Sequence, residues 1–360
     1  MYNFTSNCFA EITRFTKNCI TERGYPVEEH SVTTNDGYIN SMFRIPHGKR
    51  KQSNDDISRP PVLLCHGLTC SCTGTTFSRK HVKWNPEINK DEYWNFSWHE
   101  IAIYDLPAFV DYILEKTGFD KLFFIGHSQG ATVYAAFVSR RPEYNQKVAL
   151  CCLLGPPIIF ENTNGFRIKF VSNLIIPLME TLHNFLGLPI YELPFIGLAR
   201  FLGLYSKPNT MSHTFLQSLL FFLAGNSNYD QTSKLDFTKF CYTTPNAGSM
   251  RQIYHYSQIM RNNRFAEYDY GLEENMKVYG SPDPPLYDLS KVVSPVALFY
   301  SRNDMYTDHR DMAKLEQLLG NVVYKHEVAM ETFNHLDFLA GNDSIFLLYR
   351  HISKIMKKYI

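Results

Sequence analysis

A serine between two glycines is the part of this sequence best suited to chemistry, in the pentapeptide Gly126-His-Ser-Gln-Gly130. The apolar run Lys121 to Ile125 before it is typical of a buried strand, and Ala131 to Ser139 after it has helical spacing. So abrupt a passage from strand to helix needs positions without side chains, which glycine provides. The arrangement is typical of a nucleophile elbow, a strained turn that would present the hydroxyl of Ser128 above a sheet. The alternative is an ordinary turn with a serine in it by chance, and the flanking strand and helix favour the elbow.

A serine hydroxyl is a weak nucleophile unless a histidine takes its proton and a carboxylate holds that histidine. With this type of elbow the chain order is serine, acid, histidine. Among the 13 histidines, His335 fits best, because it lies in a predicted loop between the strand Val322 to Val328 and the last helix. The alternative for His335 is a surface histidine without a catalytic role.

Asp304 is the predicted acid, since it closely follows the predicted strand Pro295 to Tyr300. A side chain at that place can reach a histidine above the same edge of the sheet. Asp308 and Asp311 are the other candidates. We expect Asp308 to cap the following helix and Asp311 to lie inside it, and both roles are common. The sequence therefore predicts a serine, histidine and aspartate triad for acyl transfer, without a metal ion.

The negative charge that develops on a carbonyl oxygen in such a reaction is stabilised by backbone N–H donors. An elbow supplies one donor from the residue after the serine, here Gln129. The second is expected from Leu68, in the loop that follows the predicted strand Pro61 to Cys65.

The elements that must position these residues alternate between strands and helices. Two strands, His30 to Thr34 and Tyr38 to Ile45, are joined by Asn35-Asp-Gly37, a strong hairpin signal. A further strand is predicted at Lys147 to Leu154, and helices from near Asp105 to Gly118 and from about Ser344 to Lys358. Together with the strands named above, this alternation predicts an α/β fold with a mainly parallel sheet.

Strand signals fade between Pro157 and Pro285, where apolar helical segments such as Leu174 to Leu193 and Phe215 to Leu223 are interrupted by proline and glycine. We expect an inserted helical domain there. The predicted division is a core formed by residues 1–156 and 286–360, with a helical cap formed by residues 157–285.

Composition excludes several classes of protein. The 360 residues are 44% hydrophobic, and 36 Lys+Arg against 35 Asp+Glu give a net charge of +1, so that no nucleic-acid partner is expected. The eight cysteines contain no C-x-x-C pair, and we expect neither a metal site nor a cofactor. No run of 18 uncharged apolar residues predicts a membrane span, and the first 25 residues do not have the pattern of a signal peptide. Three sequons would be glycosylated in a secreted protein, at Asn3, Asn95 and Asn342.

Several short motifs together resemble the acid lipase family, which includes gastric and lysosomal acid lipases, from about Tyr25 to the C-terminus. They are Gly24-Tyr-Pro-Val-Glu-Glu-His30, Asn35-Asp-Gly-Tyr38, Phe43-Arg-Ile-Pro-His-Gly48, His66-Gly-Leu68, Ser78-Arg-Lys-His81, Tyr104-Asp-Leu-Pro107, Gly126-His-Ser-Gln-Gly130 and Asn334-His-Leu-Asp-Phe338. The resemblance implies an α/β-hydrolase fold whose helical cap covers the site. It also implies hydrolysis of triacylglycerols or sterol esters at a lipid–water interface, in a secreted or lysosomal protein.

Carried over residue by residue, the resemblance makes Ser128 the nucleophile, Asp304 the acid and His335 the base, with Leu68 and Gln129 as oxyanion donors. These are the residues chosen above from their own positions.

The sequence departs from the family's pattern at three places. Only ten residues separate Leu68 from Arg79, too few for the helix and strand that the family has there, so that one core strand and helix are expected to be missing. The family's secretory signal is absent from the chain as written, and Cys241 has no second cysteine in the cap to pair with. The alternatives to an active lipase are therefore a catalytically inactive, lipase-like lipid-binding protein or a truncated gene model. An esterase for small soluble acyl substrates is a third hypothesis.

Overall fold

The computed structural model describes residues 13–49, 59–68, 70, 77–78, 90–163, 165–186, 210–211, 214–215, 218, 224–225, 240, 244 and 248–360. Most of two predicted features lies outside the described residues, namely the apolar segment Phe215 to Leu223 and the short connection from Leu68 to Arg79.

A five-stranded sheet, in the order β3-β5-β6-β7-β8, forms the centre of the protein. Its strands are β3 (Val62–Cys65), β5 (Leu122–His127), β6 (Val148–Leu154), β7 (Val296–Tyr300) and β8 (Val322–Glu327), and every neighbouring pair is parallel. The predicted parallel sheet is confirmed, and each strand lies within about two residues of its predicted bounds. The carboxyl ends of β5 and β7 therefore meet at one edge of the sheet, where Ser128 and Asp304 follow them.

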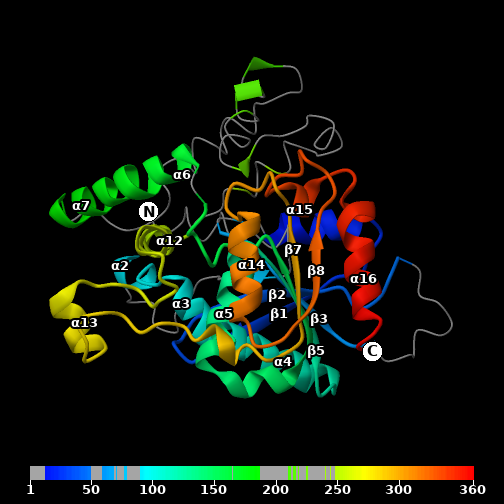
Figure 1. Cartoon of the computed structure of the whole chain (residues 1–360). Helices are drawn as coiled ribbons and strands as arrows, with labels where there is room; N and C mark the ends of the chain where they lie inside the picture. The colour runs from blue at the N-terminus through cyan, green and yellow to red at the C-terminus, as the bar shows by residue number, and fades with distance from the viewer. Residues whose placement is uncertain are drawn as a thin grey trace.

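Alternating side chains of these strands are buried on opposite faces of the sheet. Phe124, Leu153 and Leu298 belong to one core cluster, which includes residues of α4 (Leu106–Thr117), α5 (Gln129–Arg140) and α14 (His309–Leu318). Phe123 and Phe299 belong to a second cluster, with residues of α15 (Asp337–Ala340) and α16 (Arg350–Met356). Figure 1 shows α14 and α16 on either side of β7 and β8. Both faces are covered, as expected for strands that are apolar along their whole length.

The N-terminal strands form a sheet of their own. The predicted hairpin is β1 (Glu28–Thr33) with β2 (Ile39–Arg44), and β2 also pairs with β4 (Phe77–Ser78), a two-residue strand that the sequence did not predict. Within the described residues, no strand joins β2 to β3, at the place where the sequence predicted a missing strand. The two sheets are connected by packing, since Val32 and Met42 contribute to the larger core cluster.

The helix predicted from Asp105 begins earlier, at Trp98. Helix α3 (Trp98–Glu100) continues through a π-helical turn (Ile101–Asp105) into α4, whose Pro107 lies in the first turn. The earlier start is stabilised by a capping box, in which Ser97 accepts a hydrogen bond from the backbone N–H of His99 and Glu100 accepts one from the backbone N–H of Ser97. The spacing Ser97-x-x-Glu100 was the signal in the sequence.

Helices also dominate the described residues between β6 and β7. They are α6 (Phe166–Phe170), α7 (Ile176–Leu186), α12 (Met250–Asn262) and α13 (Leu272–Val278); a short α2 (Lys90–Tyr93) lies earlier in the chain. In Figure 1, α6 and α7 extend beside α12 and away from the sheet. None of the described helices is both long and apolar enough to cross a membrane.

Helix α12 is attached to the core through His255, which is completely buried. Its ring stacks on the indole of Trp98, with the ring centroids 3.8 Å apart, and its Nε2 lies 2.9 Å from the carbonyl oxygen of Ala266. Burial lowers the pKa of His255 to about 3. The neutral form of this histidine is therefore part of the folded state.

We expect the free energy of unfolding to fall as the pH is lowered from about 6.5 toward 4. In that range the unfolded chain binds a proton at residue 255, which the folded chain does not bind until about pH 3. One such group contributes a slope of about 1.4 kcal/mol per pH unit. Urea unfolding at several pH values should give a shallower slope for His255→Phe, which keeps a ring on Trp98. Equal slopes for the two proteins would contradict this assignment.

Candidate active site

Ser128 occupies a strained turn between β5 and α5. Its backbone has φ 55° and ψ −121°, and it is one of two residues other than glycine with positive φ among those that the structure describes. The backbone N–H of Ser128 donates to the carbonyl oxygen of Leu154 at 2.9 Å, which fixes the turn to the end of the neighbouring strand β6. Strain of this kind is typical of functional sites and persists only where surrounding contacts enforce it.

The two glycines of the pentapeptide are required by close backbone contacts. A Cβ on Gly126 would lie 2.7 Å from the carbonyl carbon and oxygen of Gly130. A Cβ on Gly130 would lie 2.4 Å from the carbonyl oxygen of Cys65, at the end of β3. The strand, turn and helix therefore pack against β3 at a distance that only glycine permits. The sequence predicted the need for glycine in this turn but not the contact with β3.

Three residues chosen from the sequence form a continuous line of hydrogen bonds. Nε2 of His335 lies 2.7 Å from Oγ of Ser128, and Nδ1 of His335 lies 2.7 Å from Oδ2 of Asp304. The Asp304 side chain is completely buried, and its other oxygen accepts the backbone N–H of Tyr306 at 2.8 Å. In this arrangement the carboxylate accepts a hydrogen bond from Nδ1–H, so that Nε2 is left as the acceptor for the serine hydroxyl.

The loop that carries His335 is held at several points. The backbone N–H of His335 donates to the carbonyl oxygen of Ala224, and Nε2 of His127 lies 3.0 Å from the carbonyl oxygen of His335. One residue earlier, the backbone N–H of Asn334 donates to the carboxylate of Asp337 at 2.8 Å. Burial raises the pKa of Asp337 to about 6. The backbone of His335, the predicted base, is thus fixed as well as its ring.

His127, between Gly126 and Ser128, is a site residue that the sequence reasoning missed. Burial, with the neighbouring ring of His335 as a smaller cause, holds the pKa of His127 well below its usual value. The neutral ring donates through Nε2 to the His335 backbone and packs against the His335 ring, with centroids 4.8 Å apart. The position of His127 inside the pentapeptide is the feature of the sequence that could have indicated it as a site residue.

Gly155, at the end of β6, was predicted only as the end of a strand. Its φ of +52° is in the left-handed region, and a Cβ there would lie 2.8 Å from Oδ2 of Asp304 and 3.3 Å from Nδ1 of His335. The absence of a side chain at this position therefore leaves room for the contact between acid and histidine.

The two predicted oxyanion donors lie close to the serine. Gln129 is the first residue of α5, where backbone N–H groups have no partner within the helix. Gly67, directly before Leu68, lies so close to the serine that a Cβ on it would be 3.0 Å from Cβ of Ser128. The side chain of Leu68 packs against the larger core cluster, and that of Gln129 donates a hydrogen bond to Gln252 of α12.

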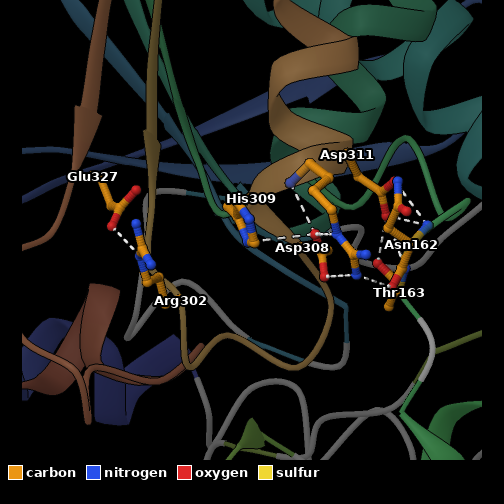
Figure 2. Close-up of polar contacts among 8 residues, drawn as sticks. Asn162, Thr163, Arg302, Asp308, His309, Asp311 and Glu327 are labelled. Atoms are coloured by element: carbon orange, nitrogen blue, oxygen red, sulfur yellow. Dashed lines mark hydrogen bonds and ion pairs between the residues drawn. The ribbon is translucent and has the colours of Figure 1, made fainter.

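The rival acids have the structural roles predicted for them, as Figure 2 shows. Asp308 is the N-cap of α14 and accepts the backbone N–H of Arg310 at 2.8 Å. Asp311 is completely buried and accepts hydrogen bonds from the backbone N–H groups and the side chains of Asn162 and Thr163. Both carboxylates thus have partners other than His335. Within the described part of the chain, no cluster of histidine, cysteine and acidic side chains could hold a metal ion.

Comparisons with known proteins bear on the fold of this chain. Residues 16–75 match the model of a partial α/β-hydrolase lipase region, and residues 73–341 match that of the α/β-hydrolase fold. Lipase 1 of Drosophila melanogaster is 33% identical over 94% of this chain and 79% of its own length. Gastric triacylglycerol lipase of Rattus norvegicus is 31% identical, over 94% of this chain and 90% of its own length.

Two further similarities concern a named hydrolase and the fold. A protein of Crotalus adamanteus named "putative lysosomal acid lipase/cholesteryl ester hydrolase" is 30% identical over 93% of this chain and 88% of its own length. The crystal structure of a "putative lipase" from Acinetobacter baumannii AYE covers 97% of both chains with a TM-score of 0.50. At 14% sequence identity that match supports the fold alone.

We expect the Asp311→Leu variant to lose about 2 to 4 kcal/mol of stability, because the buried backbone N–H of Thr163 and the partly buried one of Asn162 lose their acceptor. The Asp308→Ala variant, which removes a helix cap and an exposed ion pair with Arg310, should lose about 1 kcal/mol. Urea unfolding followed by circular dichroism measures both. A loss for Asp311→Leu no larger than that for Asp308→Ala would show that the buried carboxylate is not an essential acceptor.

Proposed function

The chain belongs to the lipase family of α/β-hydrolases, and on that premise we propose that it hydrolyses neutral lipid esters through a triad of Ser128, His335 and Asp304. The observation that carries this proposal is the pair of 2.7 Å contacts that link serine, histidine and buried carboxylate in one line. The function of the family is hydrolysis of carboxylic esters, and the roles of the individual residues are the proposal.

The first half of the reaction forms an acyl-enzyme. Oγ of Ser128 attacks the ester carbonyl carbon while its proton passes to Nε2 of His335, and a tetrahedral intermediate results. The bond from that carbon to the alcohol oxygen then breaks, and the alcohol leaves with the proton from Nε2. Asp304 accepts a hydrogen bond from the Nδ1–H group of His335 throughout, which keeps the ring oriented and stabilises its charged form.

The second half uses water in the same way. Nε2 of His335 takes a proton from a water molecule, whose oxygen attacks the acyl carbon on Ser128. The bond to Oγ breaks, the proton returns to Oγ, and the fatty acid leaves. In both halves the backbone N–H groups of Gln129 and Leu68 are proposed to bind the negative carbonyl oxygen. Removing one such donor in a comparable site typically costs ~10²- to 10³-fold in rate.

Triacylglycerols and sterol esters are the proposed substrates. Two relatives carry names that refer to triacylglycerol and to cholesteryl ester, and each aligns with more than nine-tenths of this chain. Because both relatives are named for gastric or lysosomal enzymes, a secreted or lysosomal location is proposed with the substrate. Residues 157–285, between β6 and β7, are proposed as the cap over the site.

The insoluble substrate requires contact with a lipid–water interface, and helices α6 and α7 offer a surface for it. Phe170, Leu174, Leu178 and Leu182 recur every four residues and are 45%, 53%, 51% and 46% exposed. This spacing places them on one side of the helical run, with Phe185 beyond them at 83% exposed. We name this surface the apolar stripe. Exposed apolar residues on helices of the proposed cap suit adsorption to an oil surface.

The first experiment is labelling of the purified chain with a fluorophosphonate. Oγ of Ser128 displaces fluoride from phosphorus, and the phosphonyl oxygen occupies the place of the oxyanion, so that labelling requires the triad and the donors together. We expect one added phosphonyl group by intact mass, absent in Ser128→Ala and slowed by several orders of magnitude in His335→Ala.

The control is circular dichroism of each variant, to show that it is folded. Folded wild-type protein without added mass would refute the proposed catalytic roles, as would labelling that persists in Ser128→Ala.

The apolar stripe is tested by Leu178→Asp. A leucine side chain that enters an oil surface contributes roughly 1.5 to 3 kcal/mol, so this variant should hydrolyse a triacylglycerol emulsion about tenfold more slowly at limiting enzyme. Its activity on a soluble ester such as p-nitrophenyl butyrate should equal that of the wild type. Met276→Asp on α13 is the matched control, since Met276 is 50% exposed on another helix. An equal loss in both variants, or none in Leu178→Asp, would refute the role of the stripe.

A further inference from the structure

Helix α12 makes direct polar contact with the first turn of α5, the helix that starts at the elbow. Nε2 of Gln129 donates to Oε1 of Gln252 at 2.5 Å, and both side chains are buried. One turn further along each helix, the hydroxyl of Tyr256 donates to Oγ1 of Thr132 at 3.0 Å. Two hydrogen bonds between side chains, one at each of two successive turns, thus join α12 of the proposed cap to α5, the helix that follows Ser128.

The first of these two contacts involves a residue of the proposed site. Gln129 directly follows the strained Ser128, and its backbone N–H is the proposed oxyanion donor. The peptide group that carries this N–H is held at its carbonyl end, where the oxygen of Ser128 accepts hydrogen bonds from the backbone N–H groups of Ala131 and Thr132 at 2.9 and 3.2 Å. A buried hydrogen bond from the Gln129 side chain to another element adds a restraint from outside the helix, and an oriented donor is worth more than a mobile one.

The acceptor itself is well fixed. Gln252 lies in the first turn of α12, which is capped by the Ser249 side chain. The Gln252 amide nitrogen lies 3.5 Å from the carbonyl oxygen of Ser249, which leaves Oε1 toward Gln129. Further along the helix, the stacked pair of His255 and Trp98 holds α12 against the core.

We propose that Gln252 is a positioning residue of the active site, which orients the oxyanion donor Gln129 from the cap. The proposal rests on the proposed function, since it assigns Gln129 a catalytic role. It means that an element inserted between β6 and β7, far from the pentapeptide in sequence, completes the site. Gln252 carries no motif, and nothing in the sequence distinguished it.

The test compares five variants of the full chain, namely Gln252→Met, Gln252→Glu, Gln129→Met, the double variant Gln252→Met with Gln129→Met, and Tyr256→Phe. Methionine has nearly the length of glutamine without its hydrogen-bonding amide. For each variant we would measure kcat and KM with p-nitrophenyl butyrate, the rate of fluorophosphonate labelling and the Tm. Tyr256→Phe removes the neighbouring contact between the same two helices without touching Gln129, and it is therefore the matched control.

We expect Gln252→Met to lower kcat and the labelling rate about tenfold with little change in KM, less than the ~10²- to 10³-fold loss of a whole donor. Gln129→Met keeps its backbone N–H and should lose the same factor, and the double variant should lose no more than either single one. Tyr256→Phe should keep the wild-type kcat. Gln252→Glu, which keeps an acceptor, should recover most of the rate and provides a second readout if Gln252→Met is unstable.

Unchanged kcat in Gln252→Met would overturn the proposal. The proposal would also be overturned if the losses in kcat of the two single variants multiplied in the double variant, or if Tyr256→Phe lost as much kcat as Gln252→Met. Either result would indicate a general loosening of the cap. The result is separable from that for the triad. A folded wild type that neither labels nor hydrolyses refutes the proposed function, whereas a reactive wild type and an equally reactive Gln252→Met refute only the role of Gln252.

Discussion

The rest of the site depends on the hydrogen bond between His335 and the buried carboxylate of Asp304. A carboxylate without exposure to water is costly unless it has hydrogen-bond partners, and Asp304 has two, the ring of His335 and the backbone N–H of Tyr306. Moving His335 away would leave that charge poorly compensated. Two features of the surrounding structure keep the two groups together. Gly155 leaves room for their contact because it has no side chain, and the ring of His127 hydrogen-bonds the backbone carbonyl of His335.

The parallel sheet makes this geometry possible because it brings distant segments of the chain to one edge. β5 delivers Ser128, β7 delivers Asp304, and the loop after β8 delivers His335. The elbow then needs close approach to β3, which glycine permits at Gly130. Backbone packing therefore fixes the position of Ser128, and side-chain hydrogen bonds connect its hydroxyl to His335 and Asp304.

Much of this arrangement could be predicted from the sequence, since it depends on local patterns. The five apolar strands, the glycines around Ser128 and the cap at Asp308 each follow from the chemistry of a few adjacent residues. The start of the helix at Trp98 was missed because the capping box of Ser97 and Glu100 precedes the apolar pattern from which a start near Asp105 was predicted. The roles of Gly155 and Gln252 could not be predicted from the sequence. They depend on the residues that each contacts in the folded protein, and no spacing of residues along the chain indicates those contacts.

The division between the N-terminal sheet and the five-stranded sheet has a consequence for how the chain can vary. Within the described residues, the two sheets share no ladder of backbone hydrogen bonds; they are coupled by side-chain packing, and the N-terminal sheet also contacts helix α4, where the ring of His30 meets the hydroxyl of Tyr112. A shared ladder fixes register residue by residue, whereas packed surfaces accept small sliding. The boundary between the two sheets can therefore tolerate a change in spacing, while Ser128, Asp304 and His335 all follow strands of the five-stranded sheet.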